Sequence, residues 1–255
     1  KLKKEGYASA DTKINGGHFG IDRRLDNNQV GVAISYSNGS ADFNKFAGKY
    51  KSDSVGLSLY GKKYLENNNY ILSRIGITNF DTEVNRSLLA QDGSLQNGKI
   101  KHNDIMYSTY LELGKDFKYI TPYAGFSLDI LDRKGFDENN VSWGITAKNK
   151  TYMQQNIILG LRSDYKINEN LKFTSHINQQ INIGNRDLSF KGKFNNSSTE
   201  HTFKGINQIK NTTWIGTGIE KSFSENFGVG INLDIRFDEF KKADSILSTN
   251  LYYRF

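Results

Sequence analysis

Apolar and polar residues alternate along much of this chain. Phe227, Val229 and Ile231 share one face of an extended segment, and glycine and polar residues occupy the opposite face. Side chains on a β-strand point to opposite sides in turn, so a period of two predicts strands. Helical spacing is nowhere sustained, and we expect an all-β protein. The pattern places strands at residues 3–12, 16–25, 29–40, 52–65, 70–83, 103–115, 120–131, 151–166, 171–184, 211–222, 227–237 and 246–255.

The connections between these segments carry a second regularity. Every second connection is short and rich in Asn and Asp, as at 26–28 and 168–170, and these residues suit tight turns. Most of the intervening connections are long and polar, as at 84–102, 132–150 and 185–210. In an even-numbered antiparallel sheet, all the short turns would then lie at one end. Outer-membrane barrels have this plan, with short periplasmic turns and longer external loops.

Composition agrees with a chain that is mostly paired strand. The 255 residues include one Pro and no Cys, whereas ordinary usage would give about 13 prolines. Pro lacks the amide hydrogen that a sheet ladder needs, so it is rare where most of the chain is paired. The mean hydropathy of −0.61 is that of a soluble protein. No apolar run approaches the roughly 20 residues of a transmembrane helix, so a helical membrane protein is excluded.

Two other all-β architectures compete with a membrane barrel. A soluble sandwich also alternates, but it has no reason to place its short turns at one end. A lipocalin-like barrel has about eight strands and an apolar interior. We therefore expect residues 1–255 to form one 12-stranded antiparallel transmembrane β-barrel of the outer membrane, with its apolar face toward lipid. The polar side chains expected to line the lumen are Asp22, Arg74, Glu112, Asp129, Arg162, Asp164, Glu220, Asp234 and Arg236.

Charge and candidate chemistry change this picture little. The net charge of +7 comes from interspersed basic and acidic residues, which favours a mixed surface over a nucleic-acid site. The histidines are scattered without metal-ligand spacing, and we expect no metal or cofactor. A barrel phospholipase needs a His base beside its Ser, but Ser35 stands two residues before Ser37. An omptin-like protease would need a His in the loop of Asp238 and Asp244. We expect no enzyme, and an outer-membrane hydrolase is the least favoured alternative.

Two stretches of the chain resemble a known family. The C-terminal residues 249–255 end in an aromatic residue, and Leu251, Tyr253 and Phe255 alternate with polar or aromatic neighbours. This resembles the signal by which the barrel-assembly machinery recognises outer-membrane proteins. The segments 16–25 and 31–37 resemble the start of autotransporter translocator domains, and the number of predicted strands matches that family.

The resemblance implies the C-terminal β-domain of a type V secretion protein, in the outer membrane. Such a barrel would support secretion of an N-terminal passenger, absent from this chain, through a lumen that holds a linker helix. Residues 1–5 would be the tail of that linker, and the apolar stretch of a signal peptide does not follow them. The implied partners are outer-membrane lipid, lipopolysaccharide, the assembly machinery, the passenger and its linker helix, and we expect a monomer. A passive pore or a surface adhesin barrel is the alternative.

An even strand count also predicts the path of the passenger. With Phe255 at the periplasmic face, twelve strands place the start of the first strand at that face too. A passenger on the cell surface would then reach the first strand only through the lumen.

Overall fold

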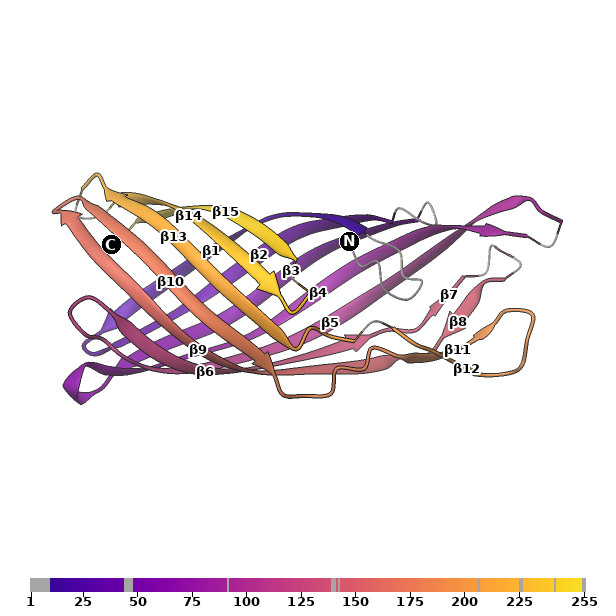
Figure 1. Ribbon diagram of the computed structural model, residues 1–255, viewed down its shortest axis with the longest axis horizontal. Helices are drawn as coiled ribbons and strands as arrows, with labels where there is room; N and C mark the ends of the chain where they lie inside the picture. The colour runs from indigo at the N-terminus through magenta and orange to yellow at the C-terminus, as the bar shows by residue number, and fades with distance from the viewer. Residues whose placement is uncertain are drawn as a thin grey trace.

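The computed structural model describes residues 10–43, 48–90, 92–138, 141, 143–205, 207–224, 227–240 and 242–253. Eleven strands form one antiparallel sheet in which each strand pairs with the next, and the sheet curls around a long axis (Figure 1). These strands are β1 (Ala10–Leu25), β2 (Asn28–Phe43), β3 (Gly48–Tyr64), β4 (Asn69–Leu89), β5 (Leu95–Lys115), β6 (Thr121–Arg133), β9 (Lys150–Asn168), β10 (Leu171–Asn182), β13 (Asn211–Ser222), β14 (Phe227–Asp238) and β15 (Ala243–Tyr253).

One face of this sheet is an exposed apolar surface. Ile34 on β2 pairs with Leu57 on β3, and Leu57 pairs with Ile77 on β4. These side chains are 56%, 49% and 44% exposed, respectively, and similar residues continue around the sheet. Soluble proteins rarely expose so large an apolar patch to water, whereas lipid covers such a face in a membrane barrel. Among the described residues, no helix is long and apolar enough to span a membrane.

The strand count differs from the prediction at the N-terminal end. Two strands were expected at 3–12 and 16–25, but β1 runs unbroken because residues 13–15 pair with residues 38–40 without a register shift. The break between the two predicted strands is therefore wrong, and the part of 3–12 before Ala10 lies outside the described residues. The described part of the chain contributes eleven strands to the sheet instead of twelve.

The direction of β1 orients the sheet relative to its turns. β1 leads into the two-residue turn before β2, so it ends at the same side of the sheet as the other short turns. We call this side the short-turn end and the opposite side the long-loop end. β1 therefore begins at the long-loop end, and the predicted start of the first strand, before Ala10, lies outside the described residues.

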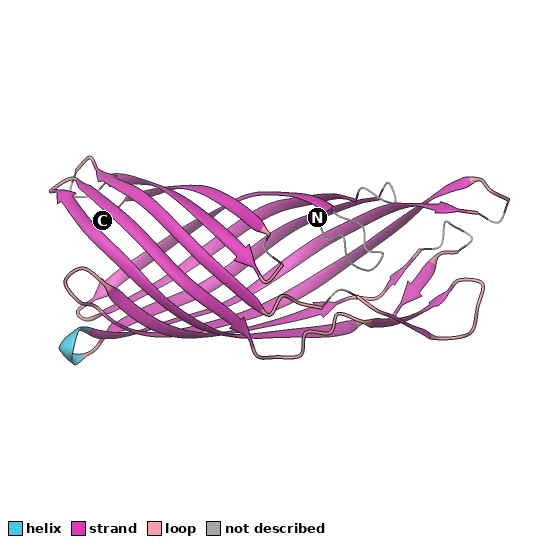
Figure 2. Ribbon diagram, viewed as in Figure 1, coloured by secondary structure: helices cyan, strands magenta, loops and turns pink. Residues whose placement is uncertain are grey.

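The long connections contain more structure than their sequences predict. Most of 84–102 belongs to the β4–β5 hairpin, because Val84 and Ile100 continue the alternating ladder. The other two long connections contribute a second sheet in the order β12-β11-β8-β7, which we call the loop sheet. Its strands are β7 (Phe136–Asp137), β8 (Ile145–Ala147), β11 (Phe190–Phe194) and β12 (His201–Phe203). The loop sheet lies at the long-loop end (Figure 1), and the short 3-10 helix Glu66–Asn68 lies at the opposite end (Figure 2).

Candidate functional site

The inner face of the curled sheet holds the polar residues predicted for the lumen. Strand register places all of them on the face opposite the apolar surface, as when Arg74 pairs with Tyr110 and Glu220 pairs with Lys172. A cavity of about 480 Å³ is lined by residues of strands from β5 to β14, including Arg162, which shows that this face encloses space.

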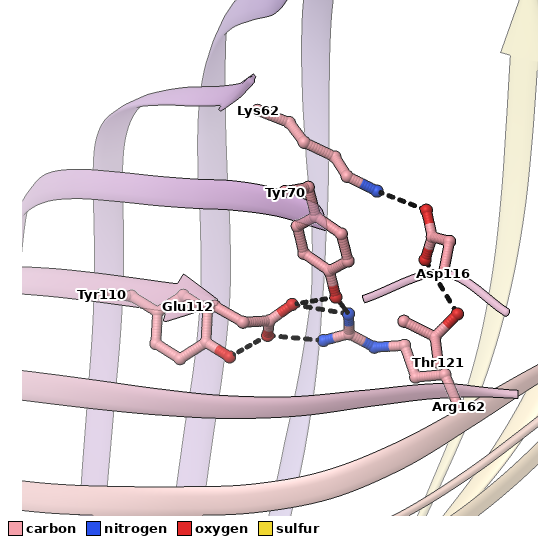
Figure 3. A network of polar contacts seen from close by, with 7 residues as sticks. All are labelled: Lys62, Tyr70, Tyr110, Glu112, Asp116, Thr121 and Arg162. Atoms are coloured by element: carbon pink, nitrogen blue, oxygen red, sulfur yellow. Dashed lines mark hydrogen bonds and ion pairs between the residues drawn. The ribbon is translucent and has the colours of Figure 1, made fainter. Parts of the chain in front are cut away.

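A buried ion pair is the centre of the most connected group on this face (Figure 3). Glu112 on β5 is 0% exposed. Arg162 on β9 donates from Nη1 to Oε1 of Glu112 and from Nη2 to Oε2, each at 2.7 Å. Tyr70 donates to Oε1 at 2.8 Å, and Tyr110 donates to Oε2. Both carboxylate oxygens thus have two donors, and the paired geometry is the strong bidentate form of an Arg–carboxylate contact. We call these four residues the Glu112 network.

Two glycines, one on β5 and one on β9, make room for the aromatic parts of this site. A Cβ on Gly114 would lie 2.3 Å from the hydroxyl of Tyr70, which is its register partner. A Cβ on Gly160 would lie 2.4 Å from the ring of Tyr123, again its register partner. The Tyr70 ring can therefore lie over the sheet and reach Glu112, and the guanidinium of Arg162 lies 4.0 Å from the centre of the Tyr123 ring.

Further contacts extend the site toward the short turns. Lys62 on β3 forms a 3.9 Å ion pair with Asp116, and its ammonium lies 3.9 Å from the centre of the Tyr70 ring. Asp116 also accepts a hydrogen bond from Thr121 at 2.8 Å (Figure 3). The wall formed by β3, β4, β5, β6 and β9 is therefore cross-linked by polar contacts near its short-turn end.

The remaining predicted lumen residues do not join the Glu112 network. Four of them form pairs with inner-face neighbours, and the other three occupy the same face elsewhere. The pairs are Asp22 with Tyr60 at 3.1 Å and Gln29 at 2.8 Å, Glu220 with Lys172 at 2.9 Å, Asp234 with His176 at 3.3 Å, and Arg236 with Asp244. Arg74 and Asp164 are exposed on the inner face, and Asp129 lines a second cavity toward the long-loop end.

The residues of the predicted assembly signal lie on the last strand. Leu251 and Tyr253 are 73% and 60% exposed on the apolar face of β15, which is an edge of the eleven-stranded sheet. Phe255 lies outside the described residues. Recognition of these side chains by an assembly machinery stays a prediction.

A second buried ion pair was not predicted from the sequence. Glu138, just after β7, is 0% exposed and accepts a hydrogen bond from Nε of Arg86 on β4 at 2.9 Å. The amide of Ile145 donates to its other oxygen at 3.2 Å. A Cβ on Gly98 would lie 2.0 Å from Oε1 of Glu138, so this glycine leaves space for the carboxylate. The only sequence signal is that Arg86 continues the inner-face alternation of β4.

Histidines occupy two carboxylate pairs on the inner face. His102 Nδ1 lies 2.8 Å from Asp104 Oδ1, and His176 Nε2 lies 3.3 Å from Asp234 Oδ1. Within the described ranges, no group of three or more His, Cys, Asp or Glu side chains could hold a metal ion.

An apolar outer face, a polar inner face and one antiparallel curled sheet define an outer-membrane β-barrel. The family model for the autotransporter beta-domain matches residues 1–234, and the chain belongs to that family. It is an outer-membrane translocator barrel. No curated protein matches the chain in sequence.

Solved structures of autotransporter domains share this fold. The translocator domain of NalP from Neisseria meningitidis superimposes with a TM-score of 0.83 at 14% identity, over 99% of this chain and 83% of that one. The beta domain of Bordetella BrkA gives 0.64 at 11%, covering 97% and 93%. The transport unit of AIDA-I from Escherichia coli gives 0.57 at 14%, covering 96% and 83%.

Proposed function

We propose that this barrel supports secretion of its own N-terminal passenger through its lumen. The observation that carries the proposal is the division between the two faces: apolar side chains cover the outside, whereas charged and aromatic side chains surround an enclosed space. The inner cavity presents Arg162, His176, Asp234 and Trp214 together, so a threaded segment would meet both signs of charge and an aromatic ring. A polar linker helix fits that lining.

The directions of the edge strands support a twelve-stranded barrel. β1 and β15 are the two edges of the sheet, and with eleven alternating strands they run the same way. Closure of an antiparallel barrel then requires one further strand that is antiparallel to both edges. Closure also removes the unpaired edges that would otherwise invite aggregation. That strand would run from the short-turn end, so the chain before it would reach the cell surface only through the lumen.

Assembly would use the exposed apolar side chains at the end of the chain. Leu251 and Tyr253 point to the lipid side of an edge strand, where an assembly machinery could pair with β15 and read its side chains. We propose this machinery and lipopolysaccharide as partners of the folded barrel, in addition to the passenger, and we propose that the barrel acts as a monomer without catalysis.

The test is surface display by the full gene product in a Gram-negative host. An epitope placed on the N-terminal side of Lys1 should become accessible to protease on intact cells, while the barrel stays folded on unheated detergent gels. An assembled barrel whose epitope stays in the periplasm would contradict the translocator function and favour a passive pore. Phe255→Asp is the assembly control: it should reduce the folded barrel and the displayed epitope together, whereas Leu2→Asp should leave assembly unchanged.

A further inference from the structure

A second cavity lies between the inner wall and the loop sheet at the long-loop end. It has a volume of about 480 Å³, within the range of small-molecule sites. Val84, Ile100, Met106 and Leu131 form its wall on β4, β5 and β6, and Leu188 closes it from the connection between β10 and β11. Its lining is therefore mainly apolar, and it is separate from the cavity beside the Glu112 network.

The polar groups at this cavity can be sorted by whether they donate or accept. His102 lines the cavity, and its Nδ1 lies 2.8 Å from the carboxylate of Asp104. That carboxylate also accepts the amide of Lys134 at 3.0 Å, so it acts as an acceptor, and in the neutral form of His102 this contact places the hydrogen on Nδ1. Nε2 of His102 is then an acceptor. Asp129, on the same lining, offers carboxylate oxygens as well.

The cationic donor in the lining is Arg133, which also contacts the loop sheet. The guanidinium of Arg133 lies 5.0 Å from the ring centres of both Phe136 and Phe190. Its Nη2 donates to the carbonyl of Lys148 at 2.9 Å, and its Nε is buried without a hydrogen-bond partner. These contacts join Arg133 on β6 to β7 and β11 of the loop sheet.

We propose that this cavity binds a small, neutral, apolar molecule that carries a hydroxyl group, such as a phenol or a short-chain alcohol. The ring or chain would lie against Met106 and Leu131, and the hydroxyl would donate to Nε2 of His102. An anionic ligand would meet the carboxylate of Asp129 in the same lining. A hydrocarbon without a hydroxyl would leave the acceptors unpaired, which costs affinity. This inference does not depend on passenger secretion.

Calorimetric titration of the barrel in detergent micelles tests the proposal with three probes of similar size. The probes are 4-methylphenol, toluene and benzoate. We expect one site for 4-methylphenol, at least tenfold tighter than for toluene, and no binding of benzoate; tenfold corresponds to about 1.4 kcal/mol. His102→Phe should bring the affinities for 4-methylphenol and toluene together, because the acceptor is gone and an aromatic ring still fills the place.

Two further variants separate this site from partition into detergent and from misfolding. Leu131→Trp should fill the cavity and abolish saturable binding of 4-methylphenol. His176→Phe removes the other paired histidine of the inner face, which lines the separate cavity, and should bind as the unchanged protein does. Equal affinities for 4-methylphenol and toluene in the unchanged barrel would overturn the proposal. Binding of benzoate, or a signal that persists in Leu131→Trp, would overturn it as well.

Discussion

The barrel buries two Glu–Arg pairs at its opposite ends. Glu112 and Glu138 are both 0% exposed, and each meets an arginine from a strand of the main sheet. The partners of Glu112 are all side chains on paired strands, whereas Glu138 is held by Arg86 and by the backbone amide of its own loop. The same chemistry thus strengthens the barrel wall at one end and attaches a loop to the wall at the other.

The difference predicts which kind of unfolding each pair resists. Removing a contact between strands that are already joined by continuous ladders affects the cooperative core of the sheet. Removing the contact that holds a loop affects local opening, which has its own smaller free energy. Variants of the Glu112 pair should therefore lower the stability of the whole barrel. Variants of the Glu138 pair should mainly increase local opening of the loop.

The largest effect should come from Glu112→Leu. It leaves the guanidinium of Arg162 without its carboxylate, and breaking a buried pair in this way typically costs 3–5 kcal/mol. Because the side chain of Arg162 is 40% exposed, we expect the lower end, about 3 kcal/mol. Urea unfolding of the barrel, followed by tryptophan fluorescence, measures it. The double variant Glu112→Leu with Arg162→Met should recover most of the loss, and a double variant as unstable as the single one would show that the charge is not the cause.

A smaller effect is expected from Gly114→Ala, which leaves every charge in place. The new methyl group would stand 2.3 Å from the Tyr70 hydroxyl, so the ring must move and its 2.8 Å bond to Glu112 must lengthen. Overpacking of this kind costs about 1–3 kcal/mol. Gly61→Ala is the matched control, because its nearest atom is 3.5 Å away. Unfolding midpoints that are equal for the two variants would mean that the glycine does not position Tyr70.

Glu138→Gln tests the loop side of the comparison. It keeps the size of the side chain but weakens the bonds from Arg86 and Ile145, at a cost of about 1–2 kcal/mol in local opening. Proteolysis between β7 and β8 should become faster, while urea unfolding of the barrel stays within error of the unchanged protein. Glu169→Gln, an exposed acid in the turn between β9 and β10, serves as the control. A lowered unfolding midpoint in Glu138→Gln would mean that both pairs support the core.

The same contrast explains what the sequence could predict. Period-two alternation determines which face a residue occupies, so Glu112 and Arg162 could be assigned to the inner face from parity alone. Alternation does not determine where a ladder stops, which is why residues 13–15 were misread as a break. Strands as short as β7, with two residues, contain no measurable period. The burial of Glu138 depends on Arg86, 52 positions away, and no local pattern indicates such a contact.

The smallest effect concerns the pH dependence of the loop sheet. Ion pairs with Lys148 at 2.5 Å and Lys191 at 3.6 Å lower the pKa of Glu200 below its ordinary value. A carboxyl whose pKa is lowered on folding stabilises the folded loop above its unfolded pKa, and this contribution disappears as the pH falls through the folded pKa. Cleavage of the β11–β12 connection by an acid-stable protease should therefore accelerate slightly below the ordinary pKa of Glu. Glu200→Gln should remove that pH dependence without affecting the Glu112 network, and an unchanged pH profile would show that these lysines do not stabilise the loop sheet.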